Sequence, residues 1–253
     1  MGEQTLAYTT EDIRNIALAG HAGAGKTTLV ERLLQESGAI PEAGSVVRGD
    51  TVCDAEPQEQ ALQHSLEVAI AHLDSDGAHV NLLDTPGYPD FLGRTLSVLA
   101  AVETVAVVIN ARSGIESITQ RAMQAAYNRG LCRMIIVNQI DAPGFDGASL
   151  VAQIQGQFGA ECLPINLPAD GASKVLDCFF QPGGEGADFS SVEAAHERLV
   201  DQVVEVDEEL MELYLEQGQE LAPEQLHDPF EEALREGHLI PIAFVSAETG
   251  AGI

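Results

Sequence analysis

The chain has 253 residues, with 40 Asp and Glu against 12 Lys and Arg, which gives a formal net charge of −28. Because binding to nucleic-acid phosphates needs Lys and Arg, this composition excludes direct DNA binding and non-specific RNA binding by the whole surface. The sequence has no signal-peptide pattern and no apolar run of membrane length, and its four scattered cysteines lack metal-ligand spacing, so we expect a cytoplasmic protein with reduced thiols and no membrane contact.

The first predicted elements are a strand at residues 13–19 and a helix that begins near Thr28, with a glycine-rich loop between them. Residues 20–27 fit the pattern G-x-x-x-x-G-K-[ST], in which glycines let backbone N–H groups approach phosphate oxygens. Lys26 is expected to reach the β and γ phosphates, and the Thr27 hydroxyl to bind Mg²⁺. A chance glycine-rich turn is the alternative, but the helix that starts here favours an anion at its N-terminus. The predicted nucleotide-binding residues of this loop are His21, Ala22, Gly23, Ala24, Gly25, Lys26, Thr27 and Thr28.

The next segments are a predicted long mobile loop at 38–63, rich in Gly, Asp and Glu, and two apolar runs at 65–73 and 78–83. The runs are too close for a crossover helix and are predicted to pair as an antiparallel hairpin. The sequence D-T-P-G, from Asp84 to Gly87, follows directly. We expect Asp84 to bind Mg²⁺ through a water and the Gly87 N–H to donate to the γ-phosphate. D-x-P-G alone is an ordinary turn, but after a strand it predicts the second part of a phosphate site.

Downstream of this run, helices and strands alternate. Strands that are apolar along their length and alternate with helices indicate an α/β fold, with a mostly parallel sheet covered by helices on both faces. In such a sheet, ligands bind at the carboxyl ends of the strands. Helices are predicted at about 89–99, 115–128 and 149–158, and strands at 104–110, 133–137 and 163–165.

Two more polar runs follow predicted strands. In the first, Asn-Gln-Ile-Asp, the Asp141 carboxylate can accept two hydrogen bonds from guanine N1 and N2, a donor pair that adenine lacks. The alternative is that Asn-x-x-Asp only caps a turn. In the second, which follows the apolar run at 240–245, the Ala247 N–H is expected to approach guanine O6. The predicted base-binding residues are Asn138, Gln139, Asp141, Ser246, Ala247 and Glu248.

The spacing of these two runs predicts an insert. Asn138 and Ser246 lie 108 positions apart, roughly 70 more than one helix and one strand need. We therefore predict a nucleotide-binding domain at 1–165 and 237–253 and an inserted α+β subdomain at 166–236, with a strand at about 174–180 and then acidic helices. Between 185 and 236 the only basic residues are Arg198 and Arg235. This charge pattern indicates solvated acidic helix faces or, as the alternative, a partner site.

The four polar runs and the insert together resemble the GTP-binding domain of elongation factor G over nearly all 253 positions. Further similarities are Asn15-Ile16, the run at 84–91, and the run at 206–216, which is more specific than the phosphate loop. The divergent, second-type elongation factor G-like branch is the most similar. The resemblance implies a P-loop GTPase fold, GTP or GDP and Mg²⁺ as cofactors, and a ribosome that triggers GTP hydrolysis in the full-length protein and so helps to drive translocation.

Three residues depart from this family pattern in ways that bear on catalysis. Tyr88 stands where the family has a water-positioning His, and with Lys26 and Gly87 it makes up the predicted catalytic set. A phenol with a pKa near 10 stays neutral, so it can orient water but cannot act as a cation. Gln139 replaces a Lys whose stem lies along the nucleotide and the phosphate loop. Gly23 replaces an Asp that is associated with a monovalent cation.

The switch segment also departs from the family. Residues 62–65, Leu-Gln-His-Ser, stand where the family has Arg-Gly-Ile-Thr. Ser65 still offers a hydroxyl to Mg²⁺, so the predicted metal-binding set is Thr27, Ser65 and Asp84. A lone loop histidine is more often solvated than catalytic, and we predict a solvated His64.

The chain stops at Ile253, soon after the fourth polar run. We therefore expect an N-terminal fragment whose nucleotide-binding domain lacks its closing helix, and which self-associates through the sheet face left bare. Slow intrinsic GTP hydrolysis is expected, because Tyr88 and the altered switch activate water poorly. Two alternatives remain, a regulatory module that exchanges GTP and GDP with little hydrolysis and a release-factor-like translational GTPase.

Overall fold

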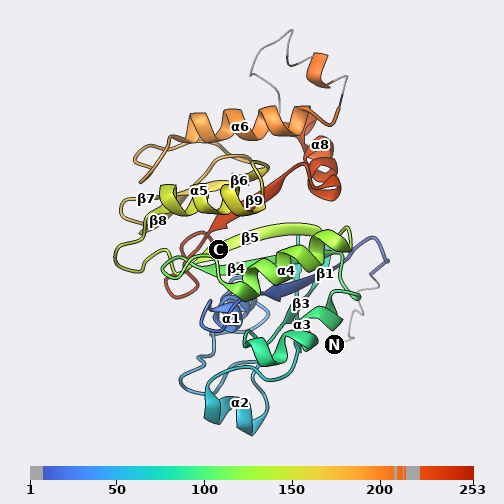
Figure 1. Cartoon of the computed structure of the whole chain (residues 1–253), viewed down its shortest axis with the longest axis vertical. Helices are drawn as coiled ribbons and strands as arrows, with labels where there is room; N and C mark the ends of the chain where they lie inside the picture. The colour runs from blue at the N-terminus through green and yellow to red at the C-terminus, as the bar shows by residue number, and fades with distance from the viewer. Residues whose placement is uncertain (1–7, 208–209, 213, 215–222) are drawn as a thin grey trace, which may run out of the picture.

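The computed structural model describes residues 8–207, 210–212, 214 and 223–253. Its main feature is a seven-stranded sheet in the order β2-β3-β1-β4-β5-β9-β6 (Figure 1). Strand β2 is antiparallel to β3, and the other neighbours are parallel, which confirms the predicted mostly parallel sheet with one hairpin strand. The strands are β1 (Ile13–Ala19), β2 (Ala69–Ser75), β3 (Ala78–Asp84), β4 (Thr104–Asn110), β5 (Cys132–Asn138), β6 (Cys162–Pro164) and β9 (Ile240–Phe244).

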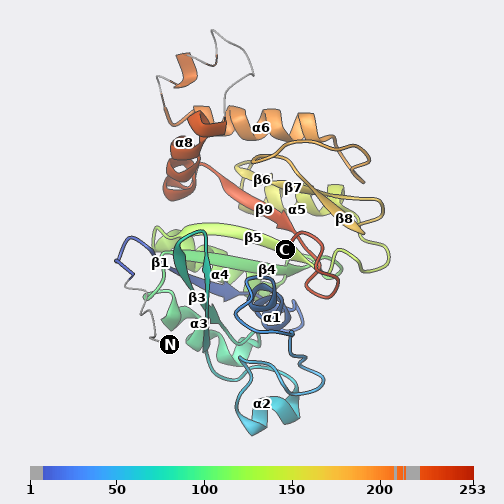
Figure 2. The same cartoon turned by 180° about the vertical axis from the view of Figure 1, so that it is seen from behind.

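Helices cover both faces of the sheet, as Figures 1 and 2 show from opposite sides. Alternate positions of a strand point to opposite faces. Leu18 and Val108 therefore join a buried cluster with Leu29 of α1, while the adjacent Ala17 and Val107 join the cluster under α4 and α5. The helices are α1 (Lys26–Glu36) on one face, and α3 (Leu92–Val98), α4 (Ser117–Asn128) and α5 (Gly147–Phe158) on the other; the short helix η1 (Pro89–Phe91) precedes α3.

A second, smaller layer lies beyond β6 and β9 (Figure 1). It contains an antiparallel pair, β7 (Asn166–Ala169) and β8 (Lys174–Asp177), and helices α6 (Val192–Val204) and α8 (Pro223–Glu236). Its apolar side chains form a core of their own, in which the Phe179 and Phe230 rings stack with centroids 4.3 Å apart. Leu163 and Leu239, which lie just outside the predicted insert at 166–236, also pack in this core. The domain boundaries stay a prediction. In the run at 206–216, residues 208, 209, 213, 215 and 216 lie outside the described residues.

The predicted loop at 38–63 contains a helix, α2 (Pro57–Leu62), that the sequence analysis missed. Pro57 suits the first turn because a helix has no partner for its N–H there. Glu56 and Glu59 form a capping box, in which the side chain of each residue accepts a hydrogen bond from the backbone N–H of the other. The helix is only one and a half turns long, too short for its apolar spacing to be visible in a polar sequence.

Two predicted strands have different ends in the structure. The run at 65–73 becomes a strand only from Ala69, because the N–H groups of Leu66 and Glu67 bind the Glu59 carboxylate instead of a strand. The strand predicted at 174–180 ends at Asp177, whose carboxylate accepts from the N–H groups of the next residues and turns the chain.

The four cysteines are free thiols, and burial raises the pKa of Cys162 and Cys178 to about 12. A thiol with so high a pKa is protonated at neutral pH and unreactive. Across the described ranges, none of the helices is both long enough and apolar enough to cross a lipid bilayer.

Candidate functional site

The polar runs predicted from the sequence come together at the carboxyl ends of β1, β3, β5 and β9. Because these strands are parallel and adjacent or nearly so in the sheet, the loops that follow them meet at one edge. A cavity of about 470 Å³ lies there, and we call it the phosphate cavity. Its lining comes from the phosphate loop and the start of α1, the segment before β2 (residues 46–65), the turn after β3 and the residue that follows β5: His21, Ala22, Gly23, Gly25, Lys26, Thr27, Thr28, Val46, Asp54, Gln63, His64, Ser65, Gly87, Tyr88 and Gln139.

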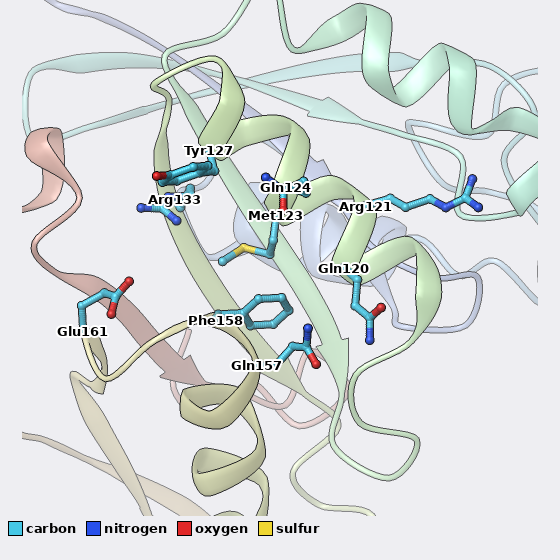
Figure 3. Close-up of a pocket in the computed structure, with 9 residues that line it drawn as sticks. All are labelled: Gln120, Arg121, Met123, Gln124, Tyr127, Arg133, Gln157, Phe158 and Glu161. Atoms are coloured by element: carbon cyan, nitrogen blue, oxygen red, sulfur yellow. The ribbon is translucent and has the colours of Figure 1, made fainter.

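A second cavity, of about 430 Å³, lies between α4 and α5 (Figure 3). Met123 and Phe158 contribute apolar side chains to it, and the Arg133 guanidinium lies 5.2 Å from the centre of the Tyr127 ring. None of the predicted site residues lines this cavity. Of these two cavities, only the phosphate cavity is lined by predicted site residues.

The phosphate loop holds Lys26 at the start of α1, where it is 6% exposed. Its Nζ donates to the carbonyl oxygens of Gly20, at 2.9 Å, and His21, at 3.1 Å. Burial lowers the pKa of Lys26, while the carboxylates of Asp84 and Asp54 act in the opposite direction. A cation held at a helix N-terminus among backbone N–H groups is suited to bind a phosphate anion.

Two glycines allow close packing around this lysine. Gly25 has a φ of 83°, and a Cβ there would lie 2.4 Å from Asn138 Nδ2. A Cβ on Gly87 would lie 2.6 Å from the Lys26 Nζ and 2.5 Å from the Ala22 nitrogen, whose N–H donates to the Gly87 carbonyl at 3.0 Å. The turn after β3 thus lies directly against the phosphate loop, as its predicted role requires.

The three predicted metal-binding residues form one cluster, in which Thr27 and Asp84 are buried and Ser65 is half-buried. The Thr27 hydroxyl donates to Asp84 Oδ2 at 2.6 Å and lies 3.4 Å from the Ser65 hydroxyl. Burial raises the pKa of Asp84 to about 6, although the positive charge of Lys26 lowers it. Asp84 Oδ1 is buried and has no hydrogen-bond partner among the residues that the structure describes. An unpartnered carboxylate oxygen beside two hydroxyls is the oxygen set that Mg²⁺ prefers, so these residues fit the ion.

Asp54 is a site residue that the sequence analysis missed. It is 2% exposed, lines the phosphate cavity, and accepts from the Ser65 hydroxyl at 2.8 Å. The surrounding loop is held by the buried Glu31, whose carboxylate accepts from the N–H groups of Gly44 and Val52. A single Asp in a chain with 40 acidic residues gives no local signal of this role.

Two of the predicted base-binding residues have different surroundings: Asn138 is buried and joins two loops, and Asp141 is exposed. Asn138 is 1% exposed; its Nδ2 donates to the Ala24 carbonyl at 2.9 Å, and its Oδ1 accepts from the Ala247 N–H at 3.0 Å. Asn138 therefore joins the phosphate loop to the loop after β9, and it takes the N–H that we expected at guanine O6. Asp141 is exposed, with its carboxylate open to a ligand.

Gln139 lies against the phosphate loop, as its position in the family pattern predicts. Its Nε2 donates to the Gly23 carbonyl at 3.1 Å, and its Oε1 accepts from Asn110 at 2.7 Å. The loop after β9 is held by Arg32 of α1, which donates to the carbonyls of Ala247, at 3.0 Å, and Glu248, at 2.7 Å. The sequence analysis missed Arg32, because its partners lie more than 200 positions away.

The remaining predicted residues have distinct surroundings. His21 Nδ1 lies 3.2 Å from a carboxylate oxygen of Glu116, so its ring faces the start of α4. The Ser246 hydroxyl is buried and accepts from the Thr249 N–H at 3.2 Å, which shapes the loop. Tyr88 is 41% exposed at the mouth of the phosphate cavity.

Comparison with known proteins identifies the family to which this chain is similar. Residues 11–253 match the family model described as the elongation factor Tu GTP binding domain. Two proteins described as elongation factor G-like, from Mycobacterium tuberculosis strains CDC 1551 / Oshkosh and ATCC 25618 / H37Rv, are each 33% identical over 252 residues. The alignment covers 95% of this chain but 35% of each relative. A crystal structure of a Thermus thermophilus protein superposes with a TM-score of 0.84 and 36% identity, covering 95% of this chain and 38% of that one.

Proposed function

The chain belongs to the elongation factor Tu GTP-binding domain family and has its P-loop GTPase fold, and from this premise we propose that it binds GTP and GDP with Mg²⁺ and hydrolyses GTP slowly. The observation that carries the proposal is the cluster of buried Lys26, Thr27 and Asp84 with half-buried Ser65 beside the phosphate cavity, and the unpartnered Asp84 Oδ1. A buried cation next to a magnesium-type oxygen set matches the needs of a triphosphate.

Each residue of the cluster has a role in this proposal. Lys26 and the backbone N–H groups of the phosphate loop hold the β and γ phosphates. Thr27, Ser65 and Asp84 would hold Mg²⁺, which when bound neutralises charge on the phosphate oxygens. The Gly87 N–H donates to the γ-phosphate, and the neutral Tyr88 phenol orients the attacking water.

Guanine selectivity is proposed to come from Asp141. Its exposed carboxylate can accept from N1 and N2 of guanine, and it follows Asn138, which is fixed to both flanking loops. Because Asn138 occupies the Ala247 N–H, the guanine O6 contact requires that this hydrogen bond be shared or exchanged. Ser246 and Arg32 support the loop from behind.

The wider role is proposed from the relatives. The chain spans about a third of the length of the elongation factor G-like proteins that it matches. We propose that in a protein of that length the ribosome stimulates the hydrolysis and that the cycle serves a translocation-type step in the cytoplasm.

One observation favours a second function, a regulatory module that exchanges GTP and GDP with little hydrolysis. Tyr88 cannot supply the positive charge of an imidazolium near the γ-phosphate. Replacing Tyr88 by His should raise ribosome-stimulated turnover of a hydrolysing factor and leave a pure exchange module unchanged.

The test of nucleotide binding is calorimetric titration of the chain with GDP, GTP and ATP, with and without Mg²⁺. We expect binding of both guanine nucleotides, strengthened by Mg²⁺, and none of ATP. Lys26→Ala should abolish it, while the control His227→Ala, whose side chain is 67% exposed on α8, should not. Preference for ATP, or no binding at millimolar nucleotide, would contradict the assignment.

A further inference from the structure

We propose that His64 is a positioning residue that holds the Tyr88 phenol at the phosphate cavity, an inference that rests on the proposed hydrolysis of GTP. The two rings are in contact, with centroids 4.6 Å apart and 54° between their planes. Both side chains line the cavity next to Lys26, Thr27 and Gly87. His64 is half-buried against Tyr88, which corrects the prediction of a solvated loop histidine.

The backbone around His64 is held on both sides. Its own N–H donates to the Glu59 carbonyl at 3.2 Å, and the preceding Gln63 has the left-handed φ of 56° that ends α2. On the other side, the Ser65 hydroxyl donates to Asp54, and the buried Glu59 carboxylate accepts from the Leu66 N–H at 2.8 Å. The imidazole therefore projects from a fixed segment and can restrict the conformations of a neighbouring ring.

The Tyr88 side chain has few other restraints. Its backbone is fixed, since the Phe91 N–H donates to the Tyr88 carbonyl at 3.0 Å and the preceding Gly87 binds the phosphate loop. Its ring is 41% exposed, and no described residue hydrogen-bonds its hydroxyl. Without His64 the phenol would gain rotamers that point into solvent. An aromatic pair of this kind changes a population by about two- to tenfold.

A separate contact keeps the two segments together, so the ring pair can be tested without undocking the loop. Arg94 Nη1 donates to the Leu66 carbonyl at 2.9 Å, and its guanidinium forms an ion pair with Glu67. These bonds do not involve His64 or Tyr88. Removing the imidazole should therefore leave the segment before β2 in place and free only the phenol.

The test is single-turnover GTP hydrolysis by the 253-residue chain and by His64→Ala, Tyr88→Ala and the double variant. We expect His64→Ala to hydrolyse GTP about two- to tenfold more slowly with unchanged affinity for GDP. His64→Phe keeps a ring and should retain most of the rate. In the Tyr88→Ala background the His64 substitution should have no further effect, because the residue acts through Tyr88. His227→Ala, far from the cavity, should match the parent chain.

Several results would overturn the proposal. Three outcomes would contradict the positioning role of His64 and leave the proposed hydrolysis standing. The first is an unchanged rate of hydrolysis in His64→Ala, and the second is the same loss of rate from His64→Ala with and without Tyr88. The third is a His64→Phe rate as low as that of His64→Ala. A chain that binds GTP and hydrolyses none of it contradicts the proposed hydrolysis and the positioning role together. Proton NMR gives an independent check: the His64 ring resonance should move in Tyr88→Ala, and a resonance that does not move shows that the rings are apart in solution.

Discussion

Replacing Asp84 by Asn is expected to stabilise the chain when nucleotide and Mg²⁺ are absent. Asp84 is 1% exposed, and burial raises its pKa from 3.8 to about 6, against the opposing effects of Lys26 and Thr27. Each pKa unit corresponds to about 1.4 kcal/mol, so the ionised carboxylate costs the folded chain about 3 kcal/mol. The carbonyl of the new amide side chain would still accept from Thr27, while its N–H₂ group would lack a partner, at a cost of about 1 kcal/mol. The net gain in unfolding free energy is therefore about 2 kcal/mol.

The stability advantage of Asp84→Asn is expected to increase with pH. Below the unfolded pKa of 3.8 both states hold the proton and the penalty is absent; it grows as pH rises toward about 6 and is complete above that pH. Urea unfolding in EDTA, followed by circular dichroism at about pH 5 and about pH 8, should show the advantage of Asp84→Asn larger at the higher pH by about 1.4 kcal/mol. Asp90→Asn, an exposed control, should show no such trend. A variant that is less stable than the parent at the higher pH, or a difference that does not vary with pH, would refute the reasoning.

Three further changes test the site. Asp141→Asn should weaken GDP binding and create binding of xanthosine diphosphate in calorimetry, because an amide donates where the carboxylate accepted; an unaltered preference for GDP would argue against the guanine assignment. Gly87→Ala should weaken GDP binding by about tenfold or more, because its Cβ would lie 2.6 Å from Lys26 Nζ, whereas at Gly93 a Cβ meets nothing within 4 Å and Gly93→Ala should leave affinity unchanged. Glu59→Ala should lower the urea unfolding free energy by about 2 kcal/mol through loss of its backbone acceptor, and equal stability would show that the segment before β2 is held by other contacts.

The parts of the site that could be predicted are those that a local pattern encodes. Residues 104–110 are mostly apolar and residues 13–19 are apolar apart from Arg14 and Asn15, and both strands have the predicted bounds in the structure. Lys26 lies after the loop that follows β1, and Asp84 is the last residue of β3. Both could be placed in one site because parallel strands bring their carboxyl ends together. A short sequence pattern is therefore sufficient to predict a site residue when the fold brings the end of its strand to the site.

The parts that could not be predicted depend on contacts between distant segments. Arg32 bonds a carbonyl 215 positions away, and its sequence neighbours show only a helix face. Asp54 belongs to the site because the loop around it closes over Glu31 and Ser65, and this closure comes from backbone hydrogen bonds to buried carboxylates. Hydrophobic periodicity carries no information on such bonds. The sequence therefore predicts a mobile loop at 38–63, whereas buried side chains organise it in the structure.

Some of the energetic costs in this structure lie where the proposed ligand would offset them. Gln63 and Gln139 are two of the non-glycine residues with positive φ, and both line the phosphate cavity. Such a conformation costs roughly 1 kcal/mol or more for a residue other than glycine. Lys26 and Asp54 add buried charges that line the same cavity, and Asp84 adds one directly behind Thr27. A phosphate on Lys26 and a cation on Asp84 would each add opposite charge beside a group that burial destabilises in its charged form. The buried charges that lower the stability of the chain alone are thus the groups that would bind the ligand. Neutralising Asp84 should therefore raise the stability measured without ligand and lower the affinity for ligand.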